Sequence, residues 1–194
     1  MYFGDFDDNN SIEQIITFKK NGKEFSISNK DELSKQLNYI SKKFVSYKDF
    51  AGLEVNEIFT DKTLKKNNLL EVNELRSLVL MSDSTKYRVS ILPKISQISP
   101  IKDIQHLDFN NDSNYDLMIF GNMTKVAPYF GSLDSNYGIL LRGDGEGNLS
   151  YVDQSKSGLK IRGDVSKVLP LDKNRSKFVI GINDKNISII SSND

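Results

Sequence analysis

Apolar and polar residues alternate along short segments near the N-terminus, with the period of a β-strand that buries one face. Two such segments, residues 16–20 and 23–27, flank the dipeptide Asn21-Gly22. Asn-Gly between alternating segments is typical of a tight hairpin turn, because both residues tolerate a positive φ. The pattern therefore predicts two antiparallel strands joined at this dipeptide.

The period changes to three or four residues after this hairpin, which indicates helix. Ser28 or Asn29, followed by Asp31 or Glu32, resembles a capping box at a helix start. The sequence therefore predicts a helical insertion over residues 29–69. Its first apolar face consists of Leu33, Leu37, Ile40 and Phe44.

Short apolar segments return from residue 70 onward, separated by turns, and predict a mostly antiparallel β protein. Their spacing is typical of a β-sandwich, a β-barrel or a β-propeller. Residues 4–17 and 107–120 also align without a gap, about a hundred residues apart. Without the helical insertion, this separation approaches the roughly 40–60 residues of one propeller blade.

The second aligned stretch carries an oxygen-bearing side chain at every second position. Ca²⁺ takes six to eight oxygen ligands, and one short loop can supply them from alternate positions. An EF-hand is excluded because Ile119 stands where its last glutamate would be, and because both flanks alternate like strands. A metal-free turn is the alternative, since Asp and Asn also cap turns. The predicted ligands are Asp108, Asn110, Asp112, Asp116 and the backbone carbonyl of Asn114.

The first aligned stretch predicts a weaker second site of the same kind. Asn10 stands where such a turn favours glycine, although asparagine tolerates the left-handed conformation better than most residues. The predicted ligands of this loop are Asp5, Asp7, Asn9, Ser11 and Glu13.

Composition removes several other classes of function. Lys plus Arg equals Asp plus Glu at 26 each, so no net charge favours nucleic acid or an anionic membrane. Cysteine is absent, and His106 is the only histidine, which excludes thiolate and multi-histidine metal sites within this chain. Since no apolar segment approaches the ~20 residues of a membrane span, we expect none.

Several motifs, taken in order, resemble a known family. The loop pattern D-x-[DN]-x-[DN]-x-x-x-[DE] between strands is similar to the FG-GAP/VCBS repeats of calcium-binding β-propellers. The segments "IFGNMTKVAP", "SNYGILLRGDGEGNLSYV", "SKSGLKIRGDVSKV" and "FVIGINDKNISII" resemble the C-terminal part of large exported bacterial proteins with VCBS repeats and an ASPIC/UnbV-type segment. Asn10 and Ser113 depart from this pattern, which has glycine in each loop.

The resemblance implies an incomplete propeller of about three blades. Blade 1 would span residues 1–95 with the insertion at 29–69, blade 2 residues 101–153, and a partial blade 3 residues 159–191. A ring needs at least four blades, so we expect a piece of a longer protein whose remaining blades are its partners. The N-terminus lacks the basic and apolar regions of a signal peptide, so only the resemblance implies an extracellular or cell-surface location.

The function implied by the resemblance is non-enzymatic: a Ca²⁺-stabilised interaction module for a protein or glycan ligand. Two alternatives stay open. One is a metal-free structural fragment of a larger propeller. The other is a carbohydrate-active enzyme domain, which would need two suitably separated carboxylates outside the turn loops.

Overall fold

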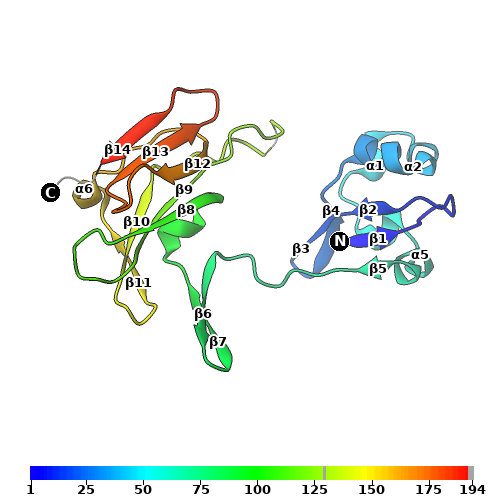
Figure 1. The fold of residues 1–194 in the computed structure, drawn as a ribbon. Coiled ribbons are helices and arrows are strands. Elements are labelled where there is room, and N and C mark those ends of the chain that lie inside the picture. Colours follow the sequence, from blue (N-terminus) through cyan, green and yellow to red (C-terminus); the bar gives the residue numbers. More distant parts are fainter. Residues whose placement is uncertain (129, 192–194) are drawn as a thin grey trace. The chain divides into compact units, whose positions relative to one another are not determined.

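The computed structural model describes residues 1–128 and 130–191 (Figure 1). Strands make up 35% and helices 19% of the structure, and the strands form several small antiparallel sheets, none of them closed in the part described. The prediction of a mostly antiparallel β protein with a helical insertion is confirmed at this level. The chain divides into an N-terminal and a C-terminal unit, with the boundary between Glu74 and Leu75.

The N-terminal unit combines two small sheets with five short helices. Strand β1 lies between β2 and β5 in one sheet, and β3 pairs with β4 in the other. The elements are β1 (Tyr2–Gly4), β2 (Glu13–Ile15), β3 (Thr17–Lys20), β4 (Lys23–Ser26), α1 (Lys30–Gln36), α2 (Asn38–Lys43), α3 (Tyr47–Phe50), α4 (Val55–Ile58), α5 (Asp61–Lys66) and β5 (Asn68–Leu69).

Local sequence signals account for both parts of this unit. Lys20 pairs with Lys23 across the turn, and Asn21 and Gly22 adopt φ angles of 52° and 78°, which confirms the predicted hairpin. Helix α1 begins after Asn29, whose side chain accepts the Glu32 amide at 3.0 Å while the Glu32 carboxylate accepts the Asn29 amide at 3.0 Å. The predicted capping box is therefore present.

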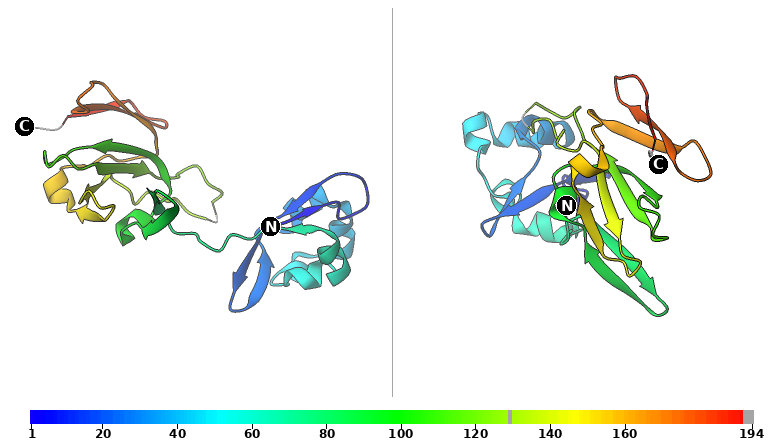
Figure 2. Two further views of the ribbon diagram at one scale, coloured as in Figure 1. Left: turned by 60° about the horizontal axis from the view of Figure 1, so that its bottom comes forward. Right: turned by 90° about the vertical axis from the view of Figure 1, so that its left-hand side faces the viewer.

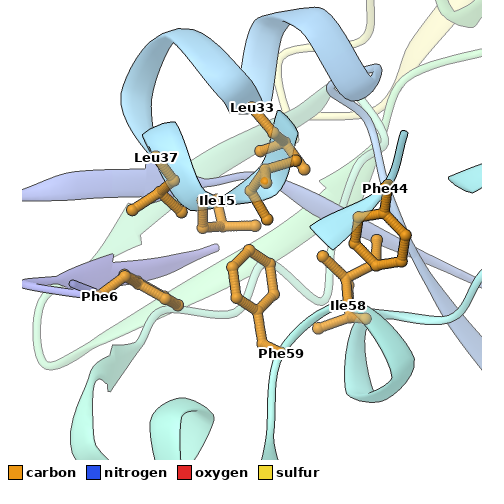
Figure 3. Close-up of a cluster of buried hydrophobic side chains, with 9 residues drawn as sticks. Phe6, Ile15, Leu33, Leu37, Phe44, Ile58 and Phe59 are labelled. Atoms are coloured by element: carbon orange, nitrogen blue, oxygen red, sulfur yellow. The ribbon is translucent and has the colours of Figure 1, made fainter. Parts of the chain in front are cut away.

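The helices form the core of the N-terminal unit together with β2 and the loop before it. The four apolar positions predicted from the helical period are all buried. Figure 3 shows Leu33 of α1 and Leu37, the residue after α1, reaching toward Ile15 of β2, with Phe6 and Phe59 facing them. Burial of one Leu or Phe side chain stabilises a fold by about 1.5–3 kcal/mol, so this cluster holds the helices on the strands.

The C-terminal unit consists of a hairpin, a four-stranded sheet and a three-stranded sheet. The four-stranded sheet has the order β11-β10-β9-β8 and the three-stranded sheet the order β12-β13-β14. The elements are β6 (Leu78–Asp83), β7 (Lys86–Ile91), the 3₁₀-helix η1 (Lys94–Gln97), β8 (Ile101–Leu107), β9 (Asp116–Gly121), β10 (Ile139–Gly143), β11 (Leu149–Val152), α6 (Gln154–Ser157), β12 (Val165–Pro170), β13 (Lys177–Ile182) and β14 (Ser188–Ser191).

The two larger sheets of the C-terminal unit lie face to face, as the left view of Figure 2 shows. Their core includes Met118, Phe120 and Leu140 from one sheet and Phe178 and Ile180 from the other. Phe120 and Ile180 are completely buried. Packing of the two inner faces excludes water from both, which is the usual basis of sheet-on-sheet stability.

A buried carboxylate links the edge strands of these two sheets. Asp103 of β8 accepts the Val168 amide at 2.5 Å and the Lys167 ammonium at 3.1 Å. Gln105 adds a hydrogen bond from its Nε2 to the Val168 carbonyl at 2.9 Å. Register shifts occur near the start of both strands, at Ile101/Asp103 in β8 and at Val165/Lys167 in β12. Asp103 thus supplies an acceptor to an edge amide of β12.

The strand grouping differs from the predicted blade boundaries. Residues 1–95 do not form one sheet, because β6 and β7 pair only with each other within the described residues and belong to the C-terminal unit. The physical reason lies in the cores. The insertion closes the N-terminal core with its own helices, whereas Val79 and Leu92 pack with Ile119 of β9.

No helix in the described part of the chain is both long enough and apolar enough to cross a lipid bilayer.

Replacing Asp103 by Ala removes the acceptor of the Val168 amide, and we expect the free energy of unfolding of the C-terminal unit to fall by about 1–3 kcal/mol. Urea unfolding measures the loss, and faster amide exchange at Val168 locates it. Lys167→Ala is the matched control, since it removes only a 61% exposed partner of the same carboxylate and costs less than about 1 kcal/mol. Equal losses of stability in the two variants would contradict the role assigned to the hydrogen bond between Asp103 and the Val168 amide.

Candidate metal centre

The first acidic loop connects β1 to β2 and is held by its own carboxylates. Asp5 accepts the amide of Asn9 at 3.1 Å through Oδ1 and the amide of Asn10 at 2.8 Å through Oδ2. Desolvation raises the pKa of the Asp5 carboxyl, but these backbone hydrogen bonds outweigh it and leave the pKa below its ordinary value. Glu13 is buried and accepts the amide of Phe6 at 2.9 Å.

The second acidic loop repeats this arrangement between β8 and β9. Asp108 accepts the amides of Asp112 at 3.1 Å and Ser113 at 2.9 Å, four and five residues downstream. Asp116 is buried and accepts the amide of Phe109 at 2.7 Å. The strand registers also agree, because Gly4 pairs with Glu13 and Leu107 pairs with Asp116.

Backbone angles show that the two aligned stretches share one conformation. Asp8 and Asn111 both have a φ of 58°, and Asn10 and Ser113 have φ angles of 65° and 67°. Asn10 and Ser113 are therefore left-handed, as expected for positions where glycine is usual. A left-handed conformation costs a residue other than glycine roughly 1–2 kcal/mol, so other interactions in each loop offset this strain.

Three carboxylates converge in the first loop. Asp5, Asp7 and Glu13 each place a carboxylate oxygen within 4.8 Å of the other two. Asp7 Oδ1 is shielded from solvent and accepts no hydrogen bond from the described residues. A buried unpaired acceptor is costly, and like charges at this separation repel. A divalent cation with oxygen ligands would relieve both.

Tyr39 of α2 lies near this trio and was not predicted from the sequence. Burial raises its pKa to about 12, and the charges of Asp7 and Glu13 contribute to the increase. Tyr39 is half-buried against the core of the N-terminal unit. Its sequence position next to Ile40, on the buried face of the insertion, is the only signal that could have placed it here.

The other two predicted ligands of the first loop, Asn9 and Ser11, carry no carboxylate. The Asn9 side chain accepts the Ser11 amide at 2.6 Å and so belongs to the turn itself. Ser11 is exposed. The structure therefore brings together three of the five side chains predicted for this loop.

In the second loop, hydrogen bonds from the protein satisfy more of the carboxylate oxygens. Asp116 is fully buried, and its second oxygen accepts the Gly143 amide at 2.9 Å. Asp112 accepts the Asn110 side-chain amide at 2.8 Å and the Asn114 backbone amide at 2.8 Å, and these bonds hold its pKa below the ordinary value. The geometry thus favours the first loop, whereas the sequence favours the second.

The position of Asn110 explains part of this difference. It occupies the place that Asp7 holds in the first loop, so the equivalent trio of the second loop contains only two carboxylates. The third carboxylate of this loop belongs to Asp112, whose two oxygens are engaged in the turn.

A third loop, between β12 and β13, repeats the turn without its acidic end. Asp172 accepts the amides of Ser176 and Lys177 at 3.0 Å each, four and five residues downstream. Arg175 is left-handed with a φ of 54°. Lys177 begins β13 five residues after Asp172, whereas Glu13 and Asp116 begin β2 and β9 eight residues after Asp5 and Asp108. The third loop is therefore shorter and has no counterpart of these two carboxylates, although Asp172 makes the same two backbone hydrogen bonds.

Comparisons of the sequence with protein-family models and with curated proteins, and of the fold with solved structures, find no match. The resemblance to FG-GAP/VCBS repeats therefore remains a prediction based on motif order. The functional argument rests on the geometry of the acidic loops.

Proposed function

We propose that this chain is a non-enzymatic β module stabilised by Ca²⁺, which binds at Asp5, Asp7 and Glu13. The observation that supports this proposal is the convergence of one carboxylate oxygen from each of the three residues, together with the buried Asp7 Oδ1, which has no hydrogen-bond partner among the described residues. The cation would offset two of the three negative charges of the trio and join the two ends of the β1–β2 loop. Its binding energy would then add to the stability of the N-terminal unit.

Ca²⁺ suits this loop better than Mg²⁺. Asp5 and Asp7 come from an irregular loop and Glu13 from the strand that follows it, and Ca²⁺ accepts variable geometry and up to eight oxygen ligands. Mg²⁺ demands a near-ideal octahedron and retains most of its waters. The second loop, with Asp108 and Asp116 at its ends, is proposed as a weaker site.

The wider setting of the proposal is a propeller-like scaffold for protein or glycan contacts outside the cell. The meander order β8 to β11, followed by β12 to β14, is compatible with successive blades. Remaining blades of a longer protein would be the natural partners of such sheets. The fold is compatible with this setting but does not by itself support it, because proteins with many different functions share one architecture.

The two alternatives receive different support. The third loop favours a metal-free structural role for such turns, since Asp172 closes it with the same two hydrogen bonds although no second carboxylate stands at the start of β13. A carbohydrate-active site would need free carboxylates outside the turns. The buried candidates Asp103 and Asp164 form ion pairs with Lys167 and Lys102, respectively, which favours structural roles for both.

Calcium should raise the melting temperature of the N-terminal unit. At a free Ca²⁺ concentration of about 100 times Kd, one site adds about 2.7 kcal/mol to the free energy of unfolding. Each kcal/mol raises the melting temperature of a unit of this size by about 4–8 °C. We expect this rise with millimolar Ca²⁺ over EDTA and a smaller one with Mg²⁺. A thermal melt of the full chain measures it, and amide shifts of residues 5–13 assign it to the loop.

The matched variants for this experiment are Asp7→Asn and Asp8→Asn. Both reproduce the residues found at the equivalent positions of the second loop, Asn110 and Asn111, so both should preserve the turn. Asp7→Asn should reduce the calcium response of the N-terminal unit to that of a weak site, whereas Asp8→Asn, which loses only an exposed ion pair with Lys66, should retain the full response. Loss of the response in both variants, or no response in the natural chain, would reject the proposed site.

Asp5→Asn and Asp108→Asn test which of the two loops binds calcium more tightly. We expect Asp5→Asn to weaken calcium binding at residues 5–13 at least tenfold, because Asp5 is a member of the trio. Asp108→Asn should leave binding at that loop unchanged. Calcium titrations followed by amide chemical shifts separate the loops. A calcium response confined to residues 108–116 would restore the order favoured by the sequence.

A further inference from the structure

The C-terminal unit contains a cavity of about 610 Å³ at one open end of the space between its two sheets. Met118 and Leu140 line it from one sheet, and Phe178 and Ile190 line it from the other. Met118, Leu140 and Phe178 are each at most 4% exposed, so the floor is continuous with the inter-sheet core. Its volume lies within the roughly 300–1,000 Å³ typical of small-molecule sites.

The repeated loops provide an internal comparison for this cavity. Phe6 of the first loop is 6% exposed and packs edge-to-face on Phe59, with ring centroids 5.1 Å apart (Figure 3). Phe109, its counterpart in the second loop, is 37% exposed and lines the cavity wall. The helical insertion covers Phe6 with apolar side chains, whereas the described residues leave the space beside Phe109 open.

The rim of the cavity is held in place by hydrogen bonds and carries positive charge. The segment 156–161 forms this rim and includes the last two residues of α6, and Gly158 ends the helix in a left-handed conformation with a φ of 68°. The Gln154 side chain donates to the Leu159 carbonyl at 2.6 Å and fixes the segment. Lys156 and Lys160 are exposed at the rim, and among the described residues no acidic side chain lines the cavity.

We propose that this cavity binds a small amphipathic carboxylic acid. Its apolar chain or ring would lie on the floor formed by Met118, Leu140 and Phe178, and its carboxylate would face Lys156 and Lys160. Burial of the apolar part supplies most of the affinity, and the two ammonium groups select an anionic head over a neutral one. This proposal does not depend on cation binding at the acidic loops.

Decanoate is a suitable probe, with decanol and decyltrimethylammonium as neutral and cationic analogues of the same chain length. We expect decanoate, kept below its micelle concentration, to bind the full chain in calorimetric titrations at neutral pH. Decanol should bind about tenfold more weakly or worse, and the cationic analogue should not bind. Amide shifts caused by decanoate should map to residues 107–118, 156–161 and 178–190. Equal affinity for decanol, shifts that map elsewhere, or no binding would overturn the proposal.

The variant Lys156→Ala/Lys160→Ala should weaken decanoate binding about tenfold while leaving decanol binding unchanged. Lys173→Ala, an exposed lysine outside the cavity lining, is the matched control and should bind decanoate as the natural chain does. Ile190→Trp should block both ligands by filling the cavity. If Ile190→Trp does not fold, the double lysine variant alone tests the proposal. The two lysine side chains are exposed, so their removal does not disturb the core. Equal weakening by Lys173→Ala would indicate a nonspecific charge effect and reject the site.

Discussion

One hydrogen-bond arrangement closes three loops of this chain and sets the pairing of the strands beside them. Asp5, Asp108 and Asp172 each accept backbone amides four and five residues downstream. The residue three positions after each aspartate is left-handed, with φ angles of 58°, 58° and 54°. Such a turn leaves amides without a strand partner, and unpaired amides are costly when they lose solvent. The carboxylate satisfies them within the loop, so the reversal of the chain depends on one side chain more than on any cation.

The residue that begins the second strand then decides what else each loop can do. Glu13 and Asp116, eight residues after Asp5 and Asp108, each accept the amide of the phenylalanine that follows the first aspartate. The shorter Asp172 loop enters β13 after five residues, at Lys177, whose side chain has no acceptor. Closure of the turn and cation chemistry are therefore separable properties of the same motif. The three loops form a series, from a converging trio with a buried unpartnered oxygen, through carboxylates satisfied by amides, to a cationic end.

Sequence reasoning succeeded where the signal is local. The Asn21-Gly22 hairpin, the capping box at Asn29 and the left-handed residues of the acidic loops are all present. It failed where the outcome depends on partners distant in sequence. The alternation of apolar residues predicts the strands β6 and β7, but it does not predict which core Val79 packs against. The Asp172 turn escaped notice because its acidic pattern is gone. Asp103 gave no signal either, since a polar residue at a buried strand position is recognisable only once Val168 is opposite it.

The helical insertion accounts for the divergence of the two acidic loops. In the N-terminal unit it covers Phe6, and it brings Tyr39 beside Asp7 and Glu13. Cover of this kind lowers the local dielectric, and mutual repulsion among carboxylates grows as solvent is excluded. The second loop has no such cover among the described residues, so Asp108 and Asp112 remain exposed and solvent screens their charges. The same lack of cover leaves Phe109 at the wall of a cavity. A single difference in packing thus underlies both proposals, a cation site in one unit and a cavity for an amphipathic ligand in the other.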